Sequence, residues 1–265
     1  MKQSRLEIVD KVATITMNKP PDNRFGFQMM DEFDEALDEV IAKKARVMIL
    51  AGDGPDFCHG GDILGWPDMA RHEILAMLRR YNEVAYRIER LPIPVIAAVQ
   101  GLCNGGGYEL ALRTDLIFAT KSARFSNTEQ QIGYITGIGG AYRSAGRAGR
   151  SLAYEWLLTS EQVPAEVMCQ HGVVNRVVDD ADLISEVTEF AKQVAKGPAL
   201  VHAAHKQLIR HAVTNGIQAA DDAMLDLHDG LLASYDLEIG MKSAVDVYLA
   251  GGSFDDRPQV PFEGR

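Results

Sequence analysis

Apolar and polar residues along the first part of the chain repeat with the periods of strands and helices. Residues 12–17 alternate as in a half-buried strand. Residues 27–41 carry apolar side chains at helical spacing with acids on the other face, and residues 46–50, with four apolar residues after Arg46, read as a buried strand. A strand, a helix and a strand in this order predict a parallel pair joined by a right-handed crossover.

The same two periods continue to about residue 180. Further strands are predicted at 95–99, 115–119 and 173–178, with a short strand or extended loop at 125–129, and helices at 70–90, 108–112, 150–159 and 164–171. Prolines 92 and 94 end the long helix of this set. The pattern therefore favours an α/β fold.

From residue 181 the pattern is helical almost throughout. The predicted helices cover about 181–196, 199–214, 217–234 and 236–250. No Gly/Ser-rich linker precedes them, so we expect an appendage rather than a freely moving domain. The predicted organisation is an α/β core over residues 1–195 and a C-terminal helical region over residues 196–265.

Composition and charge narrow the class of protein. The 265 residues are 46% hydrophobic and 24% charged, and the net charge of −10 comes without any cluster of Lys and Arg, which argues against a nucleic-acid partner. No apolar run reaches about 18 residues and the start lacks a signal-peptide pattern, so we expect no membrane contact. Three distant cysteines, Cys58, Cys103 and Cys169, fit a reducing cytoplasm and lack metal-ligand spacing.

The candidate chemistry centres on a glycine tract, residues 101–109, between a predicted strand and a predicted helix. Free backbone N–H groups at a helix N-terminus are a natural seat for an anion or an oxyanion, and Glu109 on the first turn would face it. The alternative is a close-packed turn whose glycines only avoid clashes.

Two further glycine clusters repeat this theme. Gly60 and Gly61 follow the strand at 46–50, at the end of a parallel strand where ligands bind in open α/β folds. Four glycines lie between residues 133 and 140, which predicts a second backbone cradle or a tight pass under a helix.

Four segments together form a recognisable set. They are Phe57 to Asp62; Gln100-Gly101 with Gly105 to Leu110 and the following Asp115; Phe125 and Glu129 followed by Gly133, Gly137, Gly139 and Gly140; and Ala165 with Gly172 to Val178. In order and spacing they resemble the crotonase superfamily, the enoyl-CoA hydratase/isomerase family. The resemblance implies a crotonase-like ββα superhelix with a C-terminal helical trimerisation region, and a homotrimer or a hexamer (a dimer of trimers).

The resemblance also implies a chemistry. The family's usual substrate is a coenzyme A thioester, and the backbone N–H groups of Gly61 and Gly106 would form an oxyanion hole for its carbonyl as an enolate forms. Glu109 would position and deprotonate water, and Glu129 would protonate the α-carbon. A buried pair of acids raises at least one pKa toward neutrality. The structural alternatives are a glutamate that stabilises the helix dipole and a solvated loop acid.

Residues around these glycines complete the implied substrate and coenzyme A site. They are His59, Gly60, Asp62, Ile63, Trp66, Arg24 and Gly137. His59 departs from the family, which usually has alanine there, with a backbone carbonyl that receives the adenine amine. Its side chain could face solvent, stack on adenine or alter access. Trp66 could line the acyl pocket or belong to the core.

The C-terminal segment departs from the family as well. Relatives commonly carry a basic run there that meets the coenzyme's phosphates, whereas acids stand at Asp255 and Asp256 in this chain. Arg257 remains, and Lys242 and Arg24 are other candidates for these phosphates.

The sequence thus predicts a cytoplasmic lyase of fatty acid metabolism that hydrates a 2-enoyl-CoA, with no metal and no cofactor beyond the coenzyme A of its substrate. Retention of both acids favours hydration. Two alternatives stay open. The first is different enolate chemistry, either double-bond isomerisation or hydrolysis of a non-thioester β-diketone by active-site histidines. The second is a non-catalytic paralogue that binds an acyl-CoA or a partner protein.

Overall fold

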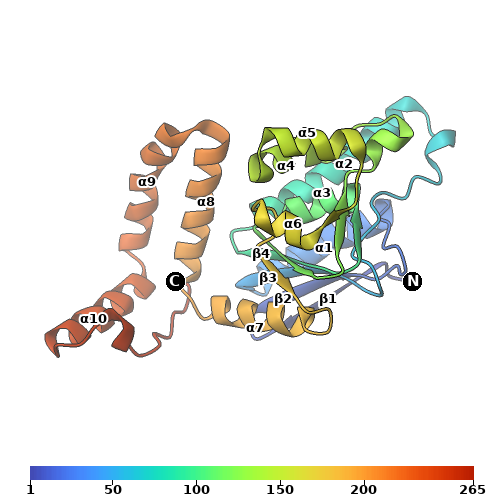
Figure 1. Ribbon diagram of the computed structural model, residues 1–265. Coiled ribbons are helices and arrows are strands. Elements are labelled where there is room, and N and C mark those ends of the chain that lie inside the picture. The colour runs from blue at the N-terminus through green and yellow to red at the C-terminus, as the bar shows by residue number, and fades with distance from the viewer.

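The computed structural model describes residues 1–265, and most of the chain follows a repeated strand–strand–helix pattern (Figure 1). The units are β1 (Ser4–Val9), β2 (Val12–Met17) and α1 (Phe27–Ala42); β3 (Val47–Gly52), an extended segment at 57–61 and α2 (Arg71–Arg90); β4 (Val95–Val99), β5 (Leu102–Asn104) and α3 (Gly106–Leu112); and β6 (Leu116–Thr120), β7 (Arg124–Ser126) and α4 (Gly140–Ala148). After α4 come α5 (Arg150–Thr159), β8 (Val163–Pro164), α6 (Ala165–Gln170), β9 (Arg176–Val178) and α7 (Leu183–Ala195).

The strands form two sheets. The larger has the order β1-β2-β3-β4-β6-β9 and the smaller has the order β5-β7-β8. Val12 pairs with Val47 and Met17 with Gly52 in a parallel register, which confirms the predicted parallel pair. Because β3 and β4 are parallel, their carboxyl ends lie at the same edge, and the two glycine segments that follow them meet there.

Helices bury both faces of the larger sheet. In Figure 1 α7 runs along one face, and the helices α1 to α6 lie on the opposite side. The α7 face contains a cluster with Ile49, Ile96 and Phe118, while the opposite face belongs to the main core of 41 buried residues. All five residues of β4 are buried, as expected for a central parallel strand that reads as a continuous apolar run.

Three helices, α8 (Ala199–Asn215), α9 (Ile217–Leu232) and α10 (Tyr235–Leu249), stand beside the core in Figure 1. Lys206 of α8 ties them to it by an ion pair with Asp115 at 2.7 Å and a hydrogen bond to the carbonyl oxygen of Ile93. No residue of α9 is buried. The domain boundary at residues 195/196 stays a prediction.

Several short elements escaped the sequence-based prediction. The strands β1, β5 and β8 and the helix α4 were not predicted, and only Arg176–Val178 of the strand predicted at 173–178 forms one. The strand β5 has three residues within the glycine tract and exists because β7 pairs with it in parallel. Such short strands depend on a distant partner rather than on a local period. The structure contains no helix with the length and hydrophobicity needed to cross a membrane.

Candidate active site

Two glycine segments lie against each other where β3 and β4 end. Gly60 and Gly105 have φ values of 100° and 50°, a backbone region that favours glycine. A Cβ added to Gly60 would lie only 2.9 Å from the backbone nitrogen of Gly106. The two turns therefore require glycine because the backbones approach so closely.

The amides of Gly61 and Gly106 are neighbours without partners. Phe25 donates its N–H to Gly60 O and accepts the N–H of Asp62, which leaves the N–H of Gly61 on the other side of this extended segment. Gly106 is the first residue of α3, where an N–H has no acceptor within the helix. A Cβ added to Gly106 would lie 3.5 Å from the nitrogen of Gly61. Two free N–H donors thus stand side by side.

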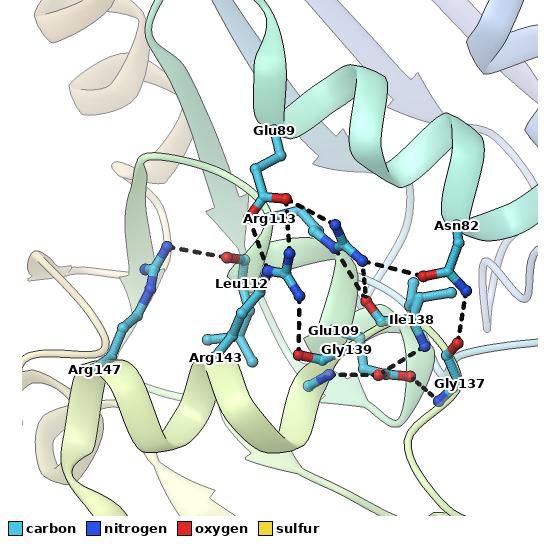
Figure 2. A network of polar contacts seen from close by, with 11 residues as sticks. Asn82, Glu89, Glu109, Leu112, Arg113, Gly137, Ile138, Gly139, Arg143 and Arg147 are labelled. Atoms are coloured by element: carbon cyan, nitrogen blue, oxygen red, sulfur yellow. Dashed lines mark hydrogen bonds and ion pairs between the residues drawn. The ribbon is translucent and has the colours of Figure 1, made fainter. Parts of the chain in front are cut away.

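Glu109, one turn into α3, is 2% exposed and is held by a backbone cradle (Figure 2). Its Oε2 accepts the N–H of Gly137 at 3.0 Å, and its Oε1 accepts the N–H groups of Ile138 at 3.0 Å and Gly140 at 2.6 Å. Burial raises its pKa, and these hydrogen bonds together with the charge of Arg113 oppose that rise. The predicted cradle at 133–140 therefore exists, and it holds Glu109.

Glu129, at the start of the short 3-10 helix Glu129–Ile132, has a different environment. Both of its carboxyl oxygens are buried, and neither has a hydrogen-bond partner. Burial first, and then the nearby charge of Glu109, raise its pKa to about 7. A Cβ added to Gly105 would lie 3.2 Å from its Oε1, so this carboxyl borders the glycine tract. Both carboxyl groups are therefore buried, and burial raises the pKa of each.

One cavity of about 270 Å³ joins these groups. Its lining includes the amides of Gly61 and Gly106, both carboxyl groups, and an apolar wall made by Phe25, Ile63, Trp66, Leu78, Tyr81, Ile132, Tyr134 and Ile138. The rings of Trp66 and Tyr134 meet edge to face at 5.7 Å, and those of Phe25 and Tyr81 at 5.3 Å. Such a pocket combines a few convergent polar groups with an apolar wall, as small-molecule sites do.

The structure brings nearly all of the predicted site residues to this cavity. Those that line it are Arg24, His59, Gly60, Gly61, Ile63, Trp66, Gly106, Glu109, Glu129 and Gly137. Asp62 lies outside the lining, and its carboxylate binds Lys19 Nζ at 2.7 Å. His59 Nε2 lies 2.9 Å from Asp56 Oδ2, so an ion pair or hydrogen bond holds the ring at the cavity edge. Trp66 lines the cavity, which is one of the two positions that the sequence left open for it, the other being the core.

Other residues of the site were missed. Tyr81 belongs to the apolar stripe of α2, and Tyr134 follows Gly133, but neither has a local feature that marks it as part of a cavity. The buried side chain of Arg113 follows Glu109 by four residues, so the two share a face of α3, and this spacing is the one signal that could have found it. The structure contains no group of three or more potential metal ligands.

Comparison with known proteins identifies the family. A sequence model of the enoyl-CoA hydratase/isomerase family matches residues 7–248. The chain belongs to this family. It is 33% identical to the 1,2-epoxyphenylacetyl-CoA isomerase of Escherichia coli K12 over 86% of this chain and 88% of the relative. It is 32% identical to the short-chain-enoyl-CoA hydratase of Clostridium acetobutylicum over 83% and 84% of the two chains.

Solved structures agree with this assignment. The chain resembles an enoyl-CoA hydratase subunit from Geobacillus kaustophilus HTA426 with a TM-score of 0.86 and 30% identity, over 99% of this chain and 98% of the other. The predicted crotonase-like fold is thus confirmed, and the protein is an enzyme of the crotonase family. Hydratases and isomerases both occur among its relatives, so family membership alone leaves the reaction open.

Proposed function

We propose that the protein is an enoyl-CoA hydratase-like lyase that adds water across the double bond of a 2-enoyl-CoA. One observation carries the proposal: the carboxyl groups of Glu109 and Glu129 and the free amides of Gly61 and Gly106 surround a single cavity. Hydration of a conjugated thioester needs these parts, namely two donors for an oxyanion, an acceptor for the proton of water and a donor to carbon.

Each group has a chemical state that suits its step. The two amides stabilise the negative charge that develops on the thioester oxygen. A carboxylate offers about four lone-pair positions, of which three are used in Glu109, so one remains to hold water and accept its proton as the oxygen bonds to the β-carbon. Glu129, with a pKa of about 7, is protonated in a large fraction of molecules and donates its proton to the α-carbon.

The remaining lining suits an acyl-CoA. The aromatic wall around Trp66 and Tyr134 would receive the acyl group, and Arg24 and His59 would lie near the coenzyme. No cofactor beyond the coenzyme A of the substrate is needed for this chemistry. All three cysteines are free, which supports the proposed cytoplasmic location.

A second candidate is isomerisation of an enoyl-CoA double bond. Glu129 is the one carboxyl of the pair whose oxygens are both free, and a double-bond shift needs a single group that carries a proton from one carbon to another.

The test measures absorbance of the conjugated thioester. With a short 2-enoyl-CoA, hydration lowers this absorbance, whereas isomerisation of a 3-enoyl-CoA raises it. We expect hydration by the wild type and a loss of about 100-fold or more in kcat for Glu129→Gln. Glu155→Gln, at an exposed position on α5, is the matched control and should retain full activity.

Three outcomes would contradict the proposed hydratase function and establish another one. A rise in absorbance from 3-enoyl-CoA without hydration of any chain length would establish an isomerase. Cleavage of a β-diketone without coenzyme A would establish a carbon–carbon hydrolase. Binding of acyl-CoA without turnover would establish a non-catalytic paralogue.

A further inference from the structure

The loop of residues 137–140, which holds Glu109, is itself held from the other side (Figure 2). Asn82 Nδ2 donates to Gly137 O at 2.9 Å, and Arg143 Nη1 donates to Gly139 O at 3.2 Å. Between them, Arg113 donates twice to Ile138 O, from Nε at 3.0 Å and from Nη2 at 2.6 Å. Three successive carbonyl groups of the loop are therefore bound by side chains from α2, α3 and α4.

Peptide geometry links the two sides of this loop. In a planar trans peptide the carbonyl group and the following N–H point in opposite directions. Side chains that hold the carbonyls of Gly137 and Gly139 outward therefore turn the N–H groups of Ile138 and Gly140 inward, onto Glu109 Oε1. The direction of these two amides depends on Asn82 and Arg143, which bind the carbonyl oxygens behind them. The carbonyl group of Ile138, bound by Arg113, shares its peptide with the N–H of Gly139, which does not donate to Glu109.

Arg113 is the centre of this arrangement. Its side chain is 0% exposed, and besides Ile138 O it binds Glu89 Oε2 at 2.7 Å and Asn82 Oδ1 at 3.2 Å. Arg143 binds the same Glu89 at 2.7 Å, so two guanidinium groups share one carboxylate. The cluster keeps a net positive charge, and its hydrogen-bond donors face the carbonyl groups of the loop.

We propose that Arg113 is a positioning residue: it binds Asn82 Oδ1 and shares Glu89 with Arg143, the two side chains that fix the peptide planes of the loop amides facing Glu109, and it thereby keeps Glu109 correctly placed for the reaction. Arg113 lies four residues after Glu109 on α3, so one helix face presents both the carboxylate that receives the loop's amides and the guanidinium that receives its carbonyl. The catalytic part of this proposal rests on the proposed function, whereas the structural part does not.

The charge of Arg113 has a second consequence. The ionisable groups that face Glu109 are Arg113 on its own helix, Glu129 on the neighbouring 3-10 helix and the Tyr134 hydroxyl across the cavity. Arg113 is the one among them that lowers the pKa of Glu109. Its removal should raise this pKa and move the acidic limb of the pH–rate profile to higher pH, because Glu109 must be ionised to accept a proton from water.

The first readout does not involve the reaction. Hydrogen exchange of the amides of Gly137, Ile138 and Gly140 is compared in the wild type and Arg113→Met, and we expect exchange to accelerate by about tenfold or more in the variant. Arg147→Met is the matched control, because Arg147, on α4, also binds main-chain carbonyl groups, those of Leu112, Thr114 and Val173, but none in the loop. It should leave exchange in the loop unchanged.

The second readout is kinetic. A displacement of about 1 Å in a reacting group lowers the rate on the order of 100-fold, so Arg113→Met should lower kcat by about that factor while KM changes by less than about threefold. Arg113→Lys keeps the charge without the planar fork and should recover part of kcat. Asn82→Ala removes the hydrogen bond to Gly137 O and should lower kcat by a smaller factor, again with little change in KM. This variant tests the proposal even if Arg113→Met does not fold.

The outcomes distinguish a failure of the proposed hydratase function from a failure of the proposed positioning role. If the wild type turns over no enoyl-CoA, the proposed function fails, and the exchange data still test the loop. If loop exchange in Arg113→Met or Asn82→Ala equals that of Arg147→Met, the positioning role is wrong whatever the activity. Accelerated loop exchange with unchanged kcat and pH profile would also overturn the proposed role.

Discussion

At the scale of single residues, two glutamates of identical chemistry acquire different properties from their surroundings. Glu109 accepts three backbone N–H groups, whereas Glu129 has no partner for either oxygen and has a pKa of about 7. Burial raises the pKa of both carboxyl groups, and three hydrogen bonds to backbone N–H groups oppose that rise in Glu109. In the proposed reaction the carboxyl group that accepts three hydrogen bonds works as the base, and the one without partners works as the acid.

This difference predicts opposite effects on stability for two Glu→Gln substitutions. The folded state raises the pKa of Glu129 from 4.5 to about 7, so it retains a proton that the unfolded chain has lost. Stability therefore falls as pH rises from about 4.5 to 7, by about 3 kcal/mol in all. Glu129→Gln should remove this penalty and be more stable than the wild type at pH 8, but not at pH 5.

Glu109→Gln should instead destabilise the protein at both pH values. A glutamine in this cradle has one oxygen in place of two and turns an N–H donor toward backbone N–H donors, which costs about 1–3 kcal/mol. Urea unfolding of both variants checks these predictions. Equal destabilisation by the two substitutions, or no dependence on pH for Glu129→Gln, would contradict this account of the site.

At the scale of elements, the glycine tract before α3 serves both of the purposes that the sequence left open. Gly106 supplies a free amide to the cavity, as an anion seat requires. At the next position, Gly107, close packing requires glycine, because a Cβ on it would lie 2.3 Å from the backbone oxygen of Cys58. The close approach of the two segments also brings the amides of Gly61 and Gly106 together.

A pair of Gly→Ala substitutions tests this reading of α3. Gly107→Ala should destabilise the protein by about 2 kcal/mol or more, because the added methyl group meets backbone that cannot move aside cheaply. Gly146→Ala, in the exposed part of α4 with no atom near the added methyl group, should stabilise it by up to about 1 kcal/mol. Thermal unfolding measures both effects, and similar shifts for the two variants would show that packing against Cys58 does not explain Gly107.

At the scale of the whole molecule, the helices α8 to α10 expose apolar surface that the single chain does not cover. The sequence alone leaves open whether the apolar residues of α9 and α10 pack against neighbouring subunits or cover the chain's own core. In the structure these residues are all half-buried or exposed: Leu227, Leu231, Leu232, Leu237, Ile239 and Met241. Exposed apolar surface of this kind marks sites of protein association. We propose that these helices join the subunits of the homotrimer, or of a hexamer built from two trimers.

Assembly through this region predicts that Leu232→Asp, at a side chain 69% exposed on α9, separates the subunits. Light scattering after size-exclusion chromatography should then give the mass of one chain, 29.1 kDa, instead of three or six. Ile184→Asp, at a 57% exposed position on α7, is the control and should leave the assembly intact. A monomeric wild type would refute the proposed assembly directly.

The sequence by itself determined most of the elements and the family to which the chain belongs. Helices such as α1 and α2 and strands such as β4 bury one face or all of their residues, and burial of this kind leaves a period that can be read locally. The glycine segments and the two acids could be identified as well, because their spacing matches that of a known family. These features depend on residues near one another in the chain.

Only the tertiary structure decided how these residues act on one another. The three amides that hold Glu109 come from residues 137–140, and the carbonyl groups of the same loop meet Asn82 and Arg113. The final packing likewise decides three further features: the contact between His59 and Asp56, the aromatic wall of the cavity, and the unpartnered oxygens of Glu129. The physical reason is that pKa, burial and hydrogen bonding are set by neighbours in space, and the chain brings those neighbours together only when it folds.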